Sequence, residues 1–390
     1  MVPPRLRSHA ARATLVSLAL MVALGMTSAM ALGGAEAPPS GLSCGDVITA
    51  DTTLDTDLLN CPNLGIVIGA DDITVDLNGH LIDGDGSPFA TCRPRKEPCD
   101  VGVLNDGHDG VTVRHGSVRE FGTGVVIGGA RHNRVLSVSS SRNQFFGFVL
   151  AGSARTVVRD SSGHENPAPD GDGMGLFGSR RIRILDSSFR HNGQLGIHVV
   201  DSPDNLFKGN LISRNHDMGI LMEADRNQVR GNNCVRNDAC IVVAPGSGNV
   251  IARNRITRGG EGIAIEKGRG NVVAGNVVVR VRRDGIRLGI GDPPIGGINT
   301  VVRRNLVSAS GEDGFLVAKN DRSALLLANV ARGGGGDGFD VRSASAELGR
   351  NRAVRNGGLG IAAVPGVIGR GGNVARHNGD ARQCIYVWCG

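Results

Sequence analysis

The 390-residue sequence has few aromatic residues: 10 Phe, 1 Tyr and 1 Trp. No segment interleaves aromatic with basic residues, which is the pattern that stacks the bases of nucleic acids. The 43 basic residues exceed the 37 acidic residues by only six. This excess is spread thinly along the chain, whereas nucleic-acid-binding proteins cluster their positive charge. We therefore expect no nucleic-acid partner.

Proline is also scarce, and long apolar runs are confined to the N-terminus. Only 15 Pro accompany the 60 Gly, which excludes a collagen repeat. Hydrophobic residues make up 40% and charged residues 21% of the chain, which is too apolar and too weakly charged for a disordered protein. After residue 31 no segment is apolar enough to cross a membrane, so we expect no stable membrane insertion of the mature chain.

The first 31 residues have the pattern of a secretory signal peptide. Three arginines precede an apolar run over residues 13–26, which is short for a membrane span. Small residues then place the cleavage site after Ala31 or, at the latest, after Ala37. An uncleaved membrane anchor is the alternative. The pattern predicts a secreted protein, located outside the cell or in the periplasm.

All eight Cys follow this segment. They form four sequence-local pairs: Cys44/Cys61, Cys92/Cys99, Cys234/Cys240 and Cys384/Cys389. An even number of Cys after a signal peptide indicates disulfides in an oxidising compartment. We expect the local pairing because every spacing is short. A zinc site is the alternative, but it needs closely spaced Cys knuckles, and only Cys384/Cys389 comes near that spacing.

A short motif of glycine, an apolar residue, any residue and a further apolar residue recurs about every 22 residues. It starts at Gly102, Gly124, Gly147, Gly175, Gly196, Gly219, Cys240, Gly262, Gly285, Gly314, Gly338 and Gly360. Asparagine recurs in phase at Asn210, Asn232, Asn254, Asn276, Asn305, Asn329, Asn351 and Asn373. Between these positions lie short alternating runs rich in β-branched residues, which are typical of strands. No segment after residue 31 sustains a helical apolar stripe.

Such a unit cannot bury its own apolar face, so it must stack on neighbouring copies. The repeat predicts an all-β parallel solenoid with three sheets around a narrow core. We expect about 12–14 rungs of roughly 22 residues, with successive rungs about 4.8 Å apart. Asparagine tolerates left-handed backbone conformations, and its amide can bond the asparagines above and below it. The repeated Asn residues are therefore predicted to form a structural ladder.

The repeat resembles the right-handed parallel β-helix of the pectate-lyase-like superfold, over about residues 44–390. The segments CGDVIT at 44–49 and DLNGH at 76–80 resemble those of secreted bacterial β-helix repeat proteins. The superfold includes polysaccharide lyases, hydrolases, epimerases, adhesins and accessory proteins, so fold alone does not decide activity. The resemblance implies a polysaccharide or cell-surface glycan as partner, processed by lyase, hydrolase or epimerase chemistry. A non-catalytic binding or structural rod at the cell surface or in the matrix is the alternative.

A stacked solenoid needs caps that keep its end strands from pairing with other chains. We predict an N-terminal cap at residues 44–64, the β-helix at 65–380 and a disulfide-bonded C-terminal cap at 381–390. The only Tyr and the only Trp, Tyr386 and Trp388, are expected to pack in the second cap. We expect a monomer.

Three segments break the period: residues 83–100, 163–173 and 289–299. Long loops on a rigid repeat scaffold are where function concentrates. All three are predicted to border the sheet formed by the glycine motif, two of them at one edge and the third at the other. The outer face of that sheet is therefore the predicted groove. Tolerated surface insertions are the alternative.

Residues two and four positions after each motif glycine should point outward. This places four predicted catalytic residues between the second and third insertions: His198, Glu223, Glu266 and Arg287. The predicted substrate contacts are Asp170, Asp172 and Phe177. Glu223 and Glu266 should lie about 9–10 Å apart, near the upper limit for the two carboxylates of an inverting glycosidase. His198 or Arg287 could accept a proton in a lyase; ordinary solvated surface is the alternative.

Four acidic residues each precede a motif glycine: Glu261, Asp284, Asp313 and Asp337. Stacked carboxylates repel one another unless cations neutralise them, and oxygen ligands from successive rungs suit calcium. Asp-Gly as ordinary turn chemistry is the alternative. Calcium is thus the one cofactor that the sequence suggests, and no metal ligands are assigned.

Overall fold

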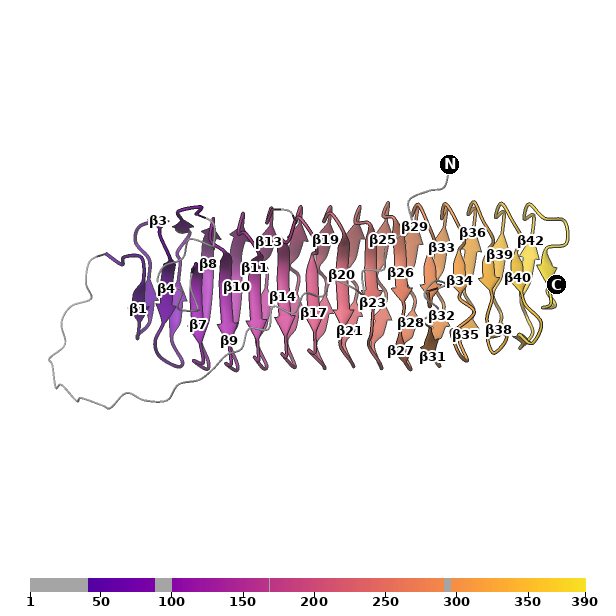
Figure 1. The fold of residues 1–390 in the computed structure, drawn as a ribbon, viewed down its shortest axis with the longest axis horizontal. Helices are drawn as coiled ribbons and strands as arrows, with labels where there is room; N and C mark the ends of the chain where they lie inside the picture. Colours follow the sequence, from indigo (N-terminus) through magenta and orange to yellow (C-terminus); the bar gives the residue numbers. More distant parts are fainter. Residues whose placement is uncertain (1–40, 88–99, 168, 291–295) are drawn as a thin grey trace. The chain divides into compact units, whose positions relative to one another are not determined.

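The computed structural model describes residues 41–87, 100–167, 169–290 and 296–390. Every regular element in these ranges is a β-strand, and the strands stack into a parallel solenoid of about 14 turns (Figure 1). Successive rungs are about 23 residues apart. The predicted all-β parallel β-helix is confirmed. The predicted signal peptide lies outside the described residues, which contain no helix with the length and apolarity to cross a membrane.

One face of the solenoid is a sheet of 15 parallel strands, here called sheet A, which contains the glycine motif. In spatial order its strands are β1 (Asp46–Ile48), β4 (Leu64–Ile68), β7 (Val101–Asp106), β9 (Thr123–Gly128), β11 (Phe146–Ala151), β14 (Asp172–Phe177), β17 (Ile197–Val200), β20 (Met218–Glu223), β23 (Ala239–Val243), β26 (Glu261–Ile265), β30 (Ile286–Leu288), β34 (Phe315–Val317), β37 (Phe339–Val341), β40 (Ile361–Ala363) and β43 (Cys384–Ile385).

Two further strand series form the other faces, and the long strands β8 (Thr112–Arg119) and β10 (Arg134–Ser141) run through both. The first series is β2 (Thr52–Thr53), β5 (Thr74–Asp76), β12 (Val157–Arg159), β15 (Arg183–Leu185), β18 (Leu206–Lys208), β21 (Gln228–Arg230), β24 (Val250–Ala252), β28 (Val272–Ala274), β32 (Val301–Arg303), β35 (Leu325–Leu327), β38 (Glu347–Gly349) and β41 (Ile368–Gly369). The second is β3 (Leu58–Cys61), β6 (Leu81–Gly84), β13 (Ser162–His164), β16 (Ser188–Arg190), β19 (Leu211–Ser213), β22 (Asn233–Val235), β25 (Arg255–Thr257), β29 (Val277–Val279), β33 (Leu306–Ser308), β36 (Val330–Arg332), β39 (Arg352–Val354) and β42 (Val374–Arg376). A short pair, β27 (Gly268–Arg269) and β31 (Gly297–Ile298), lies at a turn.

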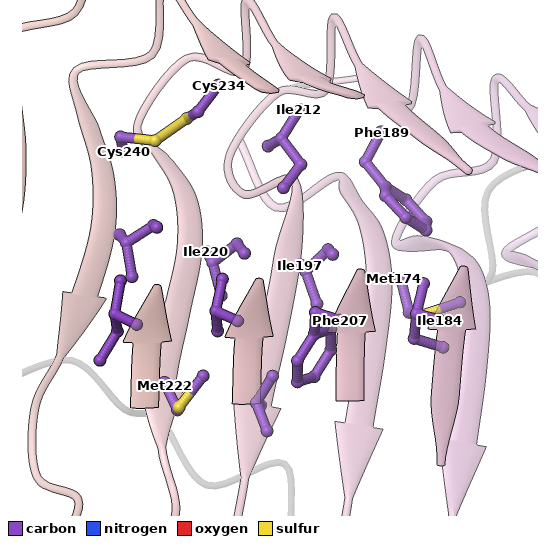
Figure 2. Packing of buried hydrophobic residues seen from close by; sticks show 14 of the residues in the cluster. Met174, Ile184, Phe189, Ile197, Phe207, Ile212, Ile220, Met222, Cys234 and Cys240 are labelled. Carbon is purple, nitrogen blue, oxygen red and sulfur yellow. A yellow bond between two sulfur atoms is a disulfide. The ribbon is translucent and has the colours of Figure 1, made fainter. Parts of the chain in front are cut away.

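The core is a continuous column of apolar side chains from all three faces. In β17, for example, Ile197 and Val199 point inward and are fully buried. Figure 2 shows Ile197 beside Phe207 from the opposite strands, and Val199 belongs to the same core cluster. The motif glycine allows the rungs to approach, because a Cβ at Gly196 would lie 2.6 Å from the carbonyl oxygen of Gly219. The glycine repeat is thus a packing requirement of the narrow solenoid.

The predicted asparagine ladder is confirmed. Asn254 is typical: its Oδ1 accepts from the backbone N–H of Asn232 at 2.9 Å, and its Nδ2 donates to Asn276 Oδ1 at 3.0 Å. The same bonds link the whole in-phase row from Asn210 to Asn373. Buried amides with both ends bonded hold the turns in register.

For one rung, the glycine assigned to the motif from the sequence lies two residues after the glycine that occupies this position in the structure. Phe148 pairs with Met174, so Gly173, not Gly175, aligns with Gly147. Both glycines precede an apolar residue, and the adjoining insertion removes the regular spacing that would choose between them. The inward and outward alternation is unchanged by a two-residue shift, so Phe177 still points outward, whereas Ser179 is buried in the following turn.

Three of the four predicted disulfides are confirmed: Cys44–Cys61, Cys234–Cys240 and Cys384–Cys389. Cys92 and Cys99 lie outside the described residues. In the segment predicted as the N-terminal cap, β1 already pairs with β4 of the solenoid.

At the other end of the solenoid β43 pairs with β40. The predicted packing of the two aromatic side chains in this segment is wrong, because Tyr386 and Trp388 are 66% and 77% exposed. Val387 between them points inward and is buried. The alternation of the chain at this end therefore directs both aromatic rings to solvent.

Candidate functional site

The outer face of sheet A presents three aligned rows of side chains, one residue before and two and four residues after each glycine. The strand register aligns His198 with Leu221, and continues that row through Val242 and Ala264 to Arg287. Glu223 and Glu266 fall in the neighbouring row, two rungs apart as predicted, with Ala244 between them.

Three of these side chains come together on successive strands, and we call them the histidine cluster: Asp172, His198 and Glu223. The His198 Nδ1 atom lies 3.6 Å from Asp172 Oδ2, and its Nε2 atom lies 3.4 Å from Glu223 Oε2. The Asp172 side chain is 2% exposed and also accepts the backbone N–H of Leu195 at 2.8 Å. The imidazole is therefore held between two carboxyl groups, with about a quarter of its surface open to solvent.

The electrostatic setting of the cluster favours protonation. Burial alone would lower the pKa of His198, but the close contacts with the carboxyl groups of Asp172 and Glu223 outweigh it and raise that pKa to about 9. Burial raises the pKa of Asp172 as well, against the opposing effect of His198. The cluster thus holds a proton at neutral pH. This favours His198 as a proton donor rather than as the predicted proton acceptor.

The predicted substrate contacts lie around this cluster. The Phe177 ring meets His198 edge to face at a centroid distance of 5.8 Å and Phe146 at 5.7 Å. Asp170 is exposed in the turn before β14, and its negative charge adds to the rise in the pKa of Asp172. Asp172 itself is the first residue of β14 and belongs to the cluster.

Arg287 forms a second group with two glutamates, here called the arginine cluster: Glu261, Glu266 and Arg287. Its Nε lies 2.5 Å from Glu261 Oε1, and its Nη2 lies 3.1 Å from Glu266 Oε1. Its Nη1 donates to the carbonyl oxygen of Gly289 at 2.6 Å. Burial would lower the pKa of Arg287, but the two glutamates raise it above its ordinary value. Arg287 is therefore a fixed cation that cannot accept a proton.

The structure does not bring the four predicted catalytic residues into one site. His198 and Arg287 are four strands apart in sheet A, which is about 19 Å at the usual strand spacing. A small apolar cluster of Ala239, Val242 and Ala264 lies between them. Each glutamate is engaged with a different partner, Glu223 with His198 and Glu266 with Arg287.

Two of the period-breaking segments border sheet A as predicted, as far as they are described. Residues 163–167 and 169–173 lead into β14 at the edge where strands begin, and residues 289–290 follow β30 at the edge where strands end. Residues 88–99 of the other segment lie outside the described residues. The cavities lie at these edges. One of about 470 Å³ is lined by His216, Arg236, Asp238, Arg258 and Arg282 with two ladder asparagines. Another of about 770 Å³ is lined in part by Lys267, Lys319, Asp321 and Arg322. The predicted site residues come from outward strand positions and the insertion at 163–173, and include none of these turn residues.

The four acidic residues that precede motif glycines form a row, here called the acidic row, and carboxylates in it accept hydrogen bonds from backbone N–H groups. Asp284 Oδ1 accepts the N–H of Asp313 at 3.0 Å, and Asp313 Oδ1 accepts the N–H of Asp337 at 2.7 Å. Burial raises the pKa of Asp284 to about 7 and that of Asp313 to about 6, so protonation relieves part of their repulsion. In the described part of the chain no three His, Cys, Asp or Glu side chains are grouped to hold a metal ion.

Comparison with known families agrees with this architecture. The model of the right-handed β-helix region matches residues 101–243 and 182–331, together more than half of the chain. The protein belongs to the right-handed β-helix family. No curated protein matches it in sequence.

Solved structures also share the fold. A point mutant of the periplasmic alginate epimerase AlgG has a TM-score of 0.53 at 17% identity, covering 77% of this chain and 84% of that one. A second AlgG mutant gives 0.51 at 16% identity, with 84% and 85% covered. The surface adhesin PfbA of Streptococcus pneumoniae gives 0.49 at 11% identity, with 77% and 83% covered. At such identities the likeness shows the fold alone.

Proposed function

We propose that this β-helix protein is a secreted enzyme that acts on extracellular polysaccharide at the histidine cluster of sheet A. The observation that carries the proposal is the imidazole of His198 between the carboxyl groups of Asp172 and Glu223, with its pKa raised to about 9. Perturbed pKa values on an accessible face are typical of acid–base sites. Three disulfides fit an oxidising compartment. The likeness to an alginate epimerase adds an analogy of fold.

The spacing within the cluster favours proton abstraction over inverting hydrolysis. An inverting glycosidase separates its two carboxyl groups by about 6.5–9.5 Å, so that sugar and water fit between them. His198 and Glu223 are 3.4 Å apart and approach a bound sugar from one side. Glu223 and Glu266 have the wider spacing, but Glu266 is neutralised by Arg287.

In the proposed reaction Glu223 removes the proton from the carbon beside a sugar carboxylate. The electron pair of that C–H bond forms a carbon–carbon double bond as the neighbouring C–O bond breaks. The imidazolium of His198 stabilises the developing negative charge and gives its proton to the departing oxygen. Asp172 orients the imidazole from its buried side, so it is a positioning residue. The products are one chain end with a new hydroxyl and one with a double bond.

A non-catalytic rod is the second function that an observation favours. Arg287 is paired with both Glu261 and Glu266, and an apolar cluster separates this group from His198. Such a face can bind a partner without any chemistry. Turnover separates the two functions, since a binding rod retains its polymer intact.

The test is an assay for the new double bond by ultraviolet absorbance, with a panel of acidic and neutral polysaccharides. We expect Glu223→Gln and His198→Asn to lower kcat by about 100-fold or more, because each removes one proton-transfer group. Glu266→Gln is the matched control, with the same chemical change on the same row, and should lose about tenfold or less. Wild-type rates in both cluster variants would refute the mechanism. Binding without turnover in the wild type would establish the rod.

The pH profile gives a second readout. The acid form of His198 is required, and its pKa in the free protein is about 9. We therefore expect kcat/KM to be sustained through neutral pH and to fall above about pH 9. A decline that begins near pH 6.5, the ordinary pKa of histidine, would show that His198 is not the proton donor.

A further inference from the structure

Four arginines occupy the same turn position on four successive rungs, and we call them the arginine row: Arg214, Arg236, Arg258 and Arg280. The backbone fixes their alignment. The N–H of Arg214 donates to the carbonyl of Val235, that of Arg236 to Thr257, and that of Arg258 to Val279. Each acceptor immediately precedes the next arginine, so the four lie one rung apart, about 4.8 Å along the solenoid.

The arginine row is exposed and lies in turns with an excess of positive charge. All four residues are exposed, and none forms an ion pair within the described ranges. The surrounding turn residues 214–217, 236–238, 258–260 and 280–283 contain six Arg, two Asp and no Glu. Asp238 is already bonded by Arg282 at 3.0 Å and by Arg283 at 3.1 Å. Like charges at rung spacing repel one another, so the row lowers stability unless an anion binds it.

The backbone conformation at this turn does not favour arginine, so the recurrence of arginine there needs another explanation. The four arginines have φ between 55° and 60°, a left-handed conformation that favours glycine. The same turn carries Ala309 on the next rung and Gly333 on the rung after it, where the basic run has ended. A long charged side chain is thus not what this turn requires, and the run is confined to a few rungs.

The position of the row relates it to the face already described. Its turns lead into β20, β23, β26 and β30, the strands that carry Glu223 at one end and Arg287 at the other. Arg236 and Arg258 also line the cavity of about 470 Å³ at this edge, together with His216, Asp238 and Arg282. The row and the outer face of sheet A therefore run along the same rungs.

We propose that the arginine row binds a linear acidic polysaccharide that lies along the solenoid axis, with its anionic groups facing successive rungs. Guanidinium groups bind carboxylates and sulfates with two parallel hydrogen bonds, and repeated charges on one polymer match repeated charges on the rungs. Nucleic acid is also a polyanion, but the turn residues of the row include no Phe, Tyr or Trp on which bases could stack. The inference rests on the proposed function and adds the surface that holds its acidic polymer.

The experiment removes two positive charges from the arginine row and, as a control, two from a turn elsewhere on the solenoid. Arg236→Gln/Arg258→Gln is the test variant. Arg253→Gln/Arg304→Gln is the control, because both residues are exposed arginines with φ of 55° and 53° at a turn between the other two faces. Both pairs are made in the Glu223→Gln background, so that the polymer stays intact. Binding of polygalacturonate, neutral dextran and single-stranded DNA is measured by calorimetry at several salt concentrations.

We expect the test pair to weaken polygalacturonate binding about tenfold or more and to reduce its salt dependence, with the control pair within about twofold of the parent. Equal losses in both pairs, or no loss in either, would overturn the inference. Single-stranded DNA bound as tightly as polygalacturonate, and lost in the same variant, would also overturn it by assigning the row to nucleic acid. The proposed chemistry is judged separately, by turnover in the His198 and Glu223 variants with the row intact.

Discussion

Single carboxyl groups at the start of the sheet A strands couple the stability of this protein to pH. Asp284 is 6% exposed, and burial together with the negative charge of Glu261 raises its pKa from 3.8 to about 7. A group with a raised pKa in the folded state contributes its full stability below the unfolded pKa. That contribution is lost as the pH rises through the folded pKa. For Asp284 the loss falls between about pH 4 and pH 7.

Asp284→Asn should therefore stabilise the protein at high pH. The amide keeps the oxygen that accepts the N–H of Asp313, but it cannot ionise. We expect little difference at pH 4 and a gain of about 2–4 kcal/mol at pH 8, seen as a higher Tm in thermal melts at the two values. The exposed Asp55→Asn is the control and should change neither. Equal melting of wild type and variant at pH 8 would show that the Asp284 carboxyl is not destabilised by burial.

For single residues, the sequence predicts which way a side chain points better than which side chains it contacts. Strict alternation along a strand was sufficient to place His198, Glu223, Glu266 and Arg287 on one outer face. Which side chains contact one another depends on how far each extends toward the neighbouring rungs. The alternation along a strand carries no information about this. Glu261 was assigned to an acidic row, yet its carboxylate bonds Arg287 on the next strand. Asp172 was predicted as a substrate contact and instead lies buried against His198.

At the scale of the strand, glycine controls how closely consecutive rungs stack. A Cβ at Gly196 would lie 2.6 Å from Gly219 O, 2.7 Å from Asn215 Nδ2 and 2.8 Å from a methyl of Ile212. Gly219 O belongs to the backbone, and Asn215 Nδ2 is bonded to the asparagine of the next rung. Neither can move without breaking hydrogen bonds. The same rule explains why eleven of the twelve motif positions could be read from sequence, whereas the neighbouring glycines Gly173 and Gly175 could not be distinguished.

Gly196→Ala should destabilise the solenoid by about 1–3 kcal/mol, the usual cost of forcing an extra methyl into a packed interior. Gly128→Ala is the matched control at the end of another sheet A strand, where the nearest atom to the new Cβ is a side-chain oxygen at 3.4 Å. We expect the control to lie within about 0.5 kcal/mol of wild type. Denaturant titration of both variants measures the difference, and equal midpoints would mean that the rungs can separate at little cost.

At the scale of the molecule, a parallel solenoid must prevent its terminal strands from pairing with other chains. β43 pairs with β40 and covers its outer edge. The Cys384–Cys389 disulfide links β43 to the residues just after it. The repeat predicted this arrangement only in outline, because the final ten residues carry no motif. The outward rings of Tyr386 and Trp388 could not be inferred from their position in the cap, since they depend on the single inward residue Val387.

We predict that a variant ending at Asp380 associates end to end. Removal of β43 exposes the N–H and C=O groups of β40, whose parallel edge is a template for another strand. Light scattering after size exclusion should show dimers or larger species that increase with concentration, while the full-length chain stays monomeric. Cys234→Ser/Cys240→Ser is the control, because it removes a disulfide buried within the solenoid and leaves both ends covered. That control should lower thermal stability without changing the oligomeric state. A truncated chain that remains monomeric across the same concentrations would mean that the residues before β43 protect the edge by themselves, and that residues 381–390 do not act as the cap.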